Sequence, residues 1–240
     1  MADEAIRTPL IKPKTRIHWH TMPETETVMK TILINASPRK NWNTAKLLDS
    51  ARQGAELMGA ETEEIHLYDL HYTGCRSCLA CKRQGAERCR CYWKDDLTPV
   101  IDRIMNAHAL IIGTPIYMGE PTAAFRALYE RLGFCALSYD GQLSYFPGKL
   151  NVGLIYTMNA PIEYYEGAMR SALQPTESFL GALFHGMVKT YAACNTLQVE
   201  DYSKYSMSMF NAEMKHAIDA ASMPSHHNAC YELGVEVSQP

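Results

Sequence analysis

The sequence predicts an α/β fold in which five parallel strands, in the order 2-1-3-4-5, form one doubly wound sheet with helices on both faces. Short continuous apolar runs such as TILIN at 31–35 and ALIIG at 109–113 are typical of strands buried on both faces of a parallel sheet. Each run is followed by a turn and then by a stretch that favours helix. The chain of 240 residues is long enough to bury such a sheet in one large domain.

Strands and helices are expected to alternate along the whole predicted domain. The expected strands are 29–36, 62–67, 109–113, 149–156 and 187–193. Two helices are expected to begin after residue 44 and at residue 97. Three more are expected to cover 121–132, 162–183 and 203–221. Asp95 and Asp96 mark the start of the second helix, Pro121 opens the third, and Pro175 should break or offset the fourth.

The predicted domain covers 29–222 and contains a cysteine-rich insertion at 70–96. Residues 1–28 carry three prolines and no sustained periodicity, so we interpret them as an N-terminal extension. Residues 223–240 are interpreted as a C-terminal tail. The order 2-1-3-4-5 is the flavodoxin-like one, in which ligands bind beyond the carboxyl ends of the strands at the switch point between strands 1 and 3.

The composition is that of an ordinary folded protein, with 47% apolar and 20% charged residues. A formal net charge of -3 argues against nucleic acid as a partner, because polyanion binders are usually basic. No run approaches the roughly 20 apolar residues that cross a bilayer, and no secretory signal is visible. We therefore predict a cytoplasmic protein without a membrane partner, in which clustered cysteines serve as metal or redox ligands rather than disulfides.

Five of the eight cysteines lie within seventeen residues, namely Cys75, Cys78, Cys81, Cys89 and Cys91. Thiolates spaced two residues apart can converge on one centre, because a tight loop turns successive sulfurs inward. Zinc would also satisfy this spacing. The other cysteines (Cys135, Cys194 and Cys230) have no near neighbour of ligand type and are expected to be ordinary thiols. The insertion follows the second strand and is expected at the same end of the sheet as the ligand site.

Two loops beyond the carboxyl ends of strands carry suitable binding groups. The first, at 37–44, offers the hydroxyls of Ser37 and Thr44, the guanidinium of Arg39 and free amides at a helix start. A phosphate monoester is bound by such a set, although a capped helix after a turn looks the same. The second, TPIYMG at 114–119, suits the face and edge of a flat conjugated ring, or plain loop packing.

These motifs resemble those of a known family. ILINASPRKNWNT followed by GTPIYMGEPTAAFRALYERL resembles the NAD(P)H-dependent FMN reductase family of flavodoxin-like proteins. GCRSCLACK between them, with a later Cys91 to Asp96 segment, resembles the iron–sulfur flavoprotein branch of that family. The resemblance covers residues 30–160 and rests on three motifs in the expected order.

The resemblance implies an FMN site and a [4Fe–4S] site. The residues implied for the FMN phosphate are Ser37, Arg39, Asn43 and Thr44, and those for the ring are Pro115, Ile116, Tyr117, Met118, Gly119, Thr157, Met158 and Asn159. The implied cluster ligands are Cys75, Cys78 and Cys81, with Cys89 or Cys91 in fourth place. The shorter gap favours Cys89 and the following Asp-Asp pair favours Cys91; we choose Cys89.

The implied activity is that of an FMN-dependent oxidoreductase that passes electrons between NAD(P)H or ferredoxin and an acceptor through FMN and the cluster. We assign no catalytic side chain, because the cofactors carry the difficult steps. The partners are a small-molecule or protein electron donor and acceptor, and the expected assembly is a homodimer or homotetramer. Three alternatives remain open: a cluster-free NAD(P)H-dependent reductase of FMN, quinones or azo dyes, an electron carrier without a small-molecule substrate, and a thiol- or zinc-based redox sensor.

Overall fold

A computed structural model describes residues 28–239, so the expected N-terminal extension lies outside the described residues except for Val28. Five parallel strands form the sheet: β1 (Lys30–Asn35), β2 (Glu61–His66), β3 (Ala109–Tyr117), β5 (Leu150–Thr157) and β6 (His185–Ala193). Their order is β2-β1-β3-β5-β6, and the short strand β4 (Glu120–Pro121) pairs with β3 in the antiparallel sense. Since β4 is counted between them, β5 and β6 are the expected fourth and fifth strands of the sheet. The predicted flavodoxin-like order 2-1-3-4-5 is therefore confirmed.

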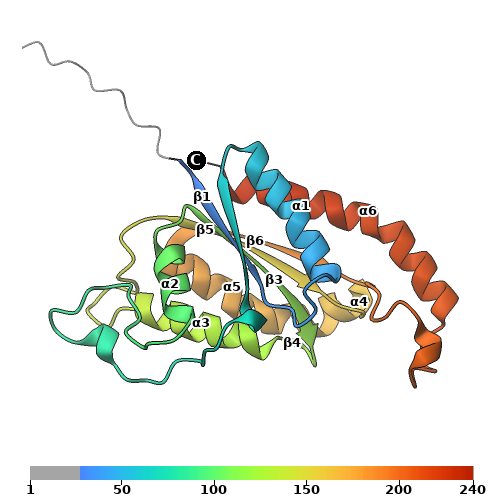
Figure 1. Cartoon of the computed structure of the whole chain (residues 1–240), viewed down its shortest axis with the longest axis horizontal. Coiled ribbons are helices and arrows are strands. Elements are labelled where there is room, and N and C mark those ends of the chain that lie inside the picture. The colour runs from blue at the N-terminus through green and yellow to red at the C-terminus, as the bar shows by residue number, and fades with distance from the viewer. Residues whose placement is uncertain (1–27, 240) are drawn as a thin grey trace, which may run out of the picture.

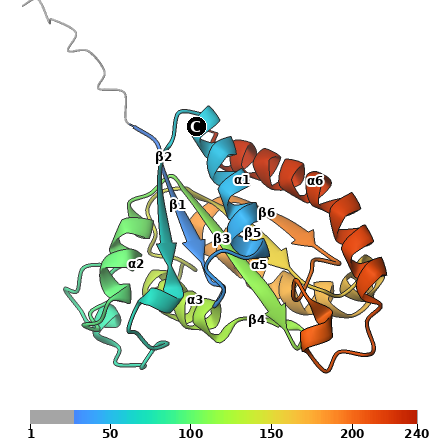
Figure 2. The ribbon, with the colours of Figure 1, turned by 45° about the vertical axis from the view of Figure 1, so that its right-hand side comes forward.

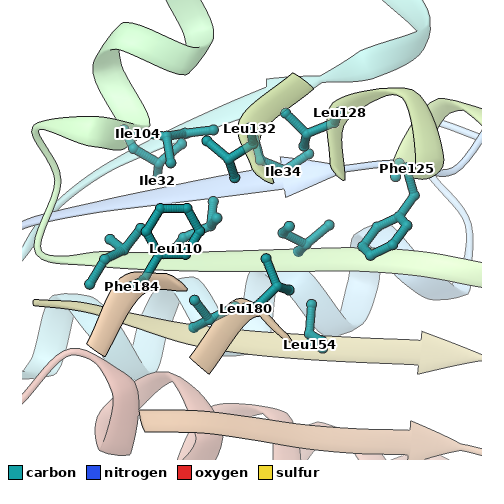
Figure 3. Close-up of a cluster of buried hydrophobic side chains, with 14 of the residues drawn as sticks. Ile32, Ile34, Ile104, Leu110, Phe125, Leu128, Leu132, Leu154, Leu180 and Phe184 are labelled. Atoms are coloured by element: carbon teal, nitrogen blue, oxygen red, sulfur yellow. The ribbon is translucent and has the colours of Figure 1, made fainter. Parts of the chain in front are cut away.

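Helices cover both faces of this sheet (Figure 1, Figure 2). One face carries α1 (Asn43–Leu57) and α6 (Ala212–Val237), and the other carries α2 (Leu97–Met105), α3 (Ala123–Ala136) and α5 (Arg170–Phe184). Successive residues of a strand point to opposite faces. Leu33 of β1 therefore packs with the α1 and α6 side chains, whereas Ile32 and Ile34 pack with those of α2, α3 and α5 (Figure 3).

Strand β3 is longer than the expected 109–113, because its pairing with β5 continues as far as Pro115 opposite Thr157. Met118 and Gly119 then form the two-residue turn between β3 and β4, with φ values of 52° and 87°. Positive φ at both central residues is typical of the tight turns that join antiparallel strands. The expected loop 114–119 is therefore the end of a strand followed by a hairpin turn.

The expected helix 162–183 is divided upstream of its proline. A short helix, α4 (Ile162–Tyr164), leads into a π-helical turn, Tyr165–Met169, and then into α5. Pro175 lies inside α5, where it cannot donate the backbone hydrogen bond of a helix interior. The helix therefore tolerates this lost bond, and its irregularity lies upstream of the proline.

The last helix differs most from expectation. We predicted 203–221, followed by a tail from 223, but α6 begins at Ala212, after Asn211 caps it, and continues to Val237. Cys230, Leu233 and Val237 are buried against α1, and this packing is what orders the segment. The expected boundary at 222 therefore falls inside a helix. Within residues 28–239, no helix has the length and apolar character needed to cross a membrane.

Candidate functional site

A pocket opens at the carboxyl ends of β1, β3 and β5 and contains about 590 Å³ of empty space, part of it open to solvent. Ten of the twelve residues predicted for FMN line it: Ser37, Arg39, Asn43, Thr44, Pro115, Ile116, Tyr117, Thr157, Met158 and Asn159. The two exceptions lie in the hairpin turn, where the Met118 side chain is 98% exposed. Met118 instead lines a neighbouring groove. The structure thus brings three separate sequence motifs to one place.

The first turn of α1 leaves its amide groups available at one end of the pocket. Its N-cap residue, Trp42, makes no side-chain capping bond, and the first turn contains no acidic side chain. The hydroxyl of Ser37 folds the preceding loop by accepting a hydrogen bond from the Arg39 amide at 3.1 Å. An uncapped N-terminus of a 15-residue helix offers free N–H groups and a positive dipole end to an anion.

The loop after β6 also lines the pocket, and the sequence prediction missed this loop. This loop contributes Thr196, Leu197 and Gln198. The Leu197 carbonyl accepts hydrogen bonds from Trp42 Nε1 at 3.1 Å and Asn43 Nδ2 at 2.8 Å, and the Gln198 carbonyl accepts one from Arg39. The rule that ligands lie beyond the carboxyl ends of parallel strands could have identified this loop as well.

Buried hydroxyls make the base of the pocket rigid. The hydroxyls of Thr44 and Thr157 lie 2.8 Å apart and join α1 to β5. Thr122 caps α3 by accepting from the Phe125 amide and donates to the Ala36 carbonyl at 2.8 Å. Because these groups are buried and paired, each is costly to displace. The base of the pocket is therefore held in place by the fold.

A second pocket collects the cysteines. Thiols from both ends of the cysteine-rich segment line it together with three residues of α3: Cys75, Cys78, Cys81 and Cys91, with Arg131, Phe134 and Cys135. Burial raises the pKa of the Cys81 thiol; Lys82 opposes this effect, and the nearby Cys91, Cys78 and Cys75 add to it. Four thiols of the predicted set therefore share one environment.

Two cysteines lie elsewhere than we expected. Cys91 lies with the first three thiols, whereas Cys89, our preferred fourth ligand, adopts a left-handed conformation and lines a separate cavity beside Phe146. Cys135, expected to be an ordinary thiol without ligand-type neighbours, lies on α3 at the same pocket as Cys91. Burial raises the pKa of Cys135 well above its usual value, and the charges of Cys91, Cys89 and Cys81 contribute.

Several protein contacts hold the cysteine segment in place. Ser77 and Leu79 take left-handed backbone conformations, which bend the loop between successive cysteines. The Lys82 ammonium donates to the carbonyls of Phe134 and Leu137, at the C-terminal end of α3, where a helix dipole favours positive charge. It also lies over the rings of Phe134, Tyr139 and Tyr145.

The four thiols line a pocket without surrounding a single point. Among residues 28–239, no three His, Cys, Asp or Glu side chains are grouped closely enough to hold one metal ion. A [4Fe–4S] cluster is larger, and each of its irons takes one thiolate. The donor set, four thiols that line one pocket, fits that group in chemistry and in number.

The two pockets lie near opposite ends of α3, and not at the same end of the sheet as we expected. In Figure 1 the segment between β2 and α2 extends away from β4, which precedes α3. The N-cap Thr122 donates to the carbonyl of Ala36, next to Ser37 of the first pocket, and Arg131 lines the second. With a rise of about 1.5 Å per residue, these two positions are roughly 13 Å apart along the helix. The segment after β2 runs along the flank of the sheet because its cysteines pack on the last turns of α3.

The strand order and the position of the first pocket define a flavodoxin-like protein. The model of the family described as NADPH-dependent FMN reductase matches residues 29–159, more than half of the chain. The chain therefore belongs to the NADPH-dependent FMN reductase family, whose members are flavodoxin-like, FMN-binding redox proteins.

Curated relatives of the chain are named iron–sulfur flavoproteins. One from Archaeoglobus fulgidus is 37% identical over 103 residues, which is 43% of this chain and 48% of the relative. Another, from Methanocaldococcus jannaschii, is 34% identical over 103 residues, 43% of this chain and 51% of the relative. The chain thus spans about half the length of these relatives.

Solved structures share the fold over most of the chain. An NAD(P)H:quinone oxidoreductase from Methanothermobacter marburgensis aligns with a TM-score of 0.65 and 15% identity, covering 89% of this chain and 98% of its own. An azoreductase from Bacillus anthracis aligns with a TM-score of 0.55 and 14% identity, covering 88% of this chain and 99% of its own. At such low sequence identity, these two structures show only that the fold is shared.

Proposed function

We propose that the chain is an iron–sulfur flavoprotein that passes electrons between NAD(P)H or a reduced ferredoxin and an acceptor. The observation that carries this proposal is the set of four thiols on one pocket, formed by Cys75, Cys78, Cys81 and Cys91. The names of the curated relatives support it. When bound, FMN supplies two-electron chemistry and a [4Fe–4S] cluster supplies one-electron chemistry.

The residues of the first pocket fit FMN. The uncapped start of α1 and the guanidinium of Arg39 suit its phosphate. Pro115, Ile116 and Tyr117 supply flat and apolar surface for its ring. The amide oxygen Oδ1 of Asn159 is buried beside the pocket and has no hydrogen-bond partner among the described residues. A ring N–H group would satisfy that oxygen, and Lys215 steadies the same residue by donating to its carbonyl at 3.1 Å.

The test is an assay of iron and flavin in protein purified without oxygen. We expect about four irons per chain, one FMN and broad visible absorption, because four thiolates bind one [4Fe–4S] cluster. If the protein contains FMN but no iron, the proposal of a cluster is wrong and a cluster-free reductase is the remaining candidate. If the protein contains neither FMN nor iron, the thiol- or zinc-based redox sensor is the remaining candidate.

A cluster-free reductase of quinones or azo dyes is the second candidate, and one cavity favours it. A groove with about 1680 Å³ of empty space, part of it open to solvent, adjoins the first pocket at Tyr117 and is lined by further aromatic side chains, including Tyr129 and Phe179. Such a groove suits a planar aromatic acceptor. Steady NAD(P)H oxidation with a quinone by iron-free, FMN-loaded protein would support this candidate. Reduction by ferredoxin alone would favour the electron carrier.

Arg39→Ala is expected to weaken FMN binding about tenfold to a hundredfold. A hydrogen bond to a charged group contributes roughly 1.5–3 kcal/mol, and each 1.4 kcal/mol is about a factor of ten. The measurement is the dissociation constant of FMN, from fluorescence titration of flavin-free protein. Lys40→Ala is the matched control, because Lys40 pairs with Asp69 and does not line the pocket. Equal FMN affinity in the Arg39 variant and the wild type would contradict the phosphate assignment.

A further inference from the structure

Arg131 is a positive charge buried between α3 and the cysteine-rich segment. Its side chain is 1% exposed, and its guanidinium forms an ion pair with Asp95 through distances of 2.7 and 3.1 Å. It also donates to the Thr98 hydroxyl at 2.9 Å and to the Thr73 carbonyl at 3.1 Å. These bonds all reach the segment that carries the cysteines or the start of α2.

The remaining donor of Arg131 meets a sulfur. Its Nε–H group donates to Sγ of Cys91 at 3.1 Å, so every nitrogen of the guanidinium is paired. An isolated buried ion costs several kcal/mol, so this full pairing is what allows a permanent charge at the cysteine pocket.

We propose that Arg131 positions Cys91 as the fourth thiolate ligand and raises the reduction potential of the cluster, an inference that rests on the proposed function. Arg131 is the guanidinium that the fold places in direct contact with a thiol of that pocket. Cys89, which lies in a separate cavity, makes no such contact among the described residues.

The physical reason is electrostatic. The potential of an iron–sulfur cluster depends on net charge, solvent exposure and hydrogen bonds to its sulfurs. Reduction adds one electron from an external donor and neither makes nor breaks a bond. A nearby positive charge and an N–H donor to a ligand sulfur both favour the state with the extra electron. The carboxylate of Asp95 acts in the opposite direction, and its partial burial keeps this influence strong.

The first test is the midpoint potential of the cluster in the anaerobically purified Arg131→Gln holoprotein. At a fixed solution potential, we expect the ratio of reduced to oxidised cluster to fall at least tenfold, which is about 59 mV for a one-electron couple. Arg131→Lys, which keeps the charge, is expected to shift the potential less. Arg126→Gln is the matched control, because Arg126 lies on the exposed side of the same helix and pairs with Glu130.

Asp95→Asn makes the test independent of whether the Arg131 variants fold. Asp95→Asn removes the opposing charge while leaving Arg131 in place, so the potential is expected to rise. A purely structural role for the ion pair would lower iron retention in both variants without moving their potentials in opposite directions. Unchanged potentials, or shifts of the same sign, would overturn the inference. The iron content of the wild-type protein tells the two failures apart. A wild type without iron would overturn both the proposed function and the role of Arg131. A wild type that contains iron, with variants that keep its potential, would overturn only the role of Arg131.

Discussion

Cys91→Ala is expected to lose the iron that Cys89→Ala retains. The structure groups Cys91 with Cys75, Cys78 and Cys81 on one pocket, and Cys89 lines another. With only three thiolates left, a [4Fe–4S] cluster lacks the ligand for its fourth iron. We therefore expect a fall from about four irons per chain to less than one in the Cys91 variant. The measurement is iron per chain after anaerobic purification, beside the FMN content.

The FMN content is the internal control for this comparison. The two pockets lie at opposite ends of α3, so both variants are expected to keep their FMN. Alanine is preferable to serine at position 89, because Cys89 is buried and a hydroxyl there would need a partner. Loss of iron from Cys89→Ala with retention by Cys91→Ala would reverse the ligand assignment. Full iron in both would point to Cys135 as a substitute ligand.

The strands and the FMN loops were predictable because their signals are local. Buried parallel strands are continuous apolar runs, and the loops that follow β1, β3 and β5 meet at one edge in any sheet of this order. Ten of the twelve predicted residues therefore line one pocket. Met118 and Gly119 do not line it, because a two-residue hairpin turn carries them past the pocket edge.

The cysteine pocket was only half predictable. The spacing of Cys75, Cys78 and Cys81 is visible in the sequence, but Cys91, the thiol that joins them at the pocket, is contacted by a side chain 40 residues away. Arg131 reaches Cys91 only after α3 has packed beside the segment, and Cys135 arrives at the pocket in the same way. The length of the gap between two cysteines contains no information on such packing. The gap therefore favoured Cys89, although Cys91 is the thiol that lines the pocket.

The end of the chain was misread for a related reason. In α6, Cys230, Leu233 and Val237 recur at helical spacing, yet the helix is ordered by contact with α1, which is more than 150 residues away. The two helices cross at glycines. A Cβ atom at Gly234 would lie 2.0 Å from the Ala51 carbonyl oxygen, and one at Gly54 would lie 2.1 Å from the Tyr231 carbonyl oxygen. Only glycine permits so close an approach of two backbones.

Gly234→Ala is therefore expected to destabilise the fold although alanine favours helix. The helix propensity gained is about 1 kcal/mol, whereas overpacking a well-packed interface costs roughly 1–3 kcal/mol. Since the obstacle is backbone and cannot rotate away, we expect the upper end, a net loss of about 2 kcal/mol. The measurement is the free energy of unfolding from urea titration.

Gly167→Ala is the matched control for this prediction, because a Cβ atom there meets nothing within 4 Å. It should leave the free energy of unfolding unchanged or raise it slightly. The same comparison tests whether α6 belongs to the flavin-binding unit. Asp219 of α6 accepts from the Leu197 amide at 3.0 Å and Lys215 holds Asn159, so loosening α6 removes support from two walls of the first pocket. Gly234→Ala should accordingly bind FMN more weakly than Gly167→Ala, and equal affinity in the two variants would mean that α6 contributes to stability alone.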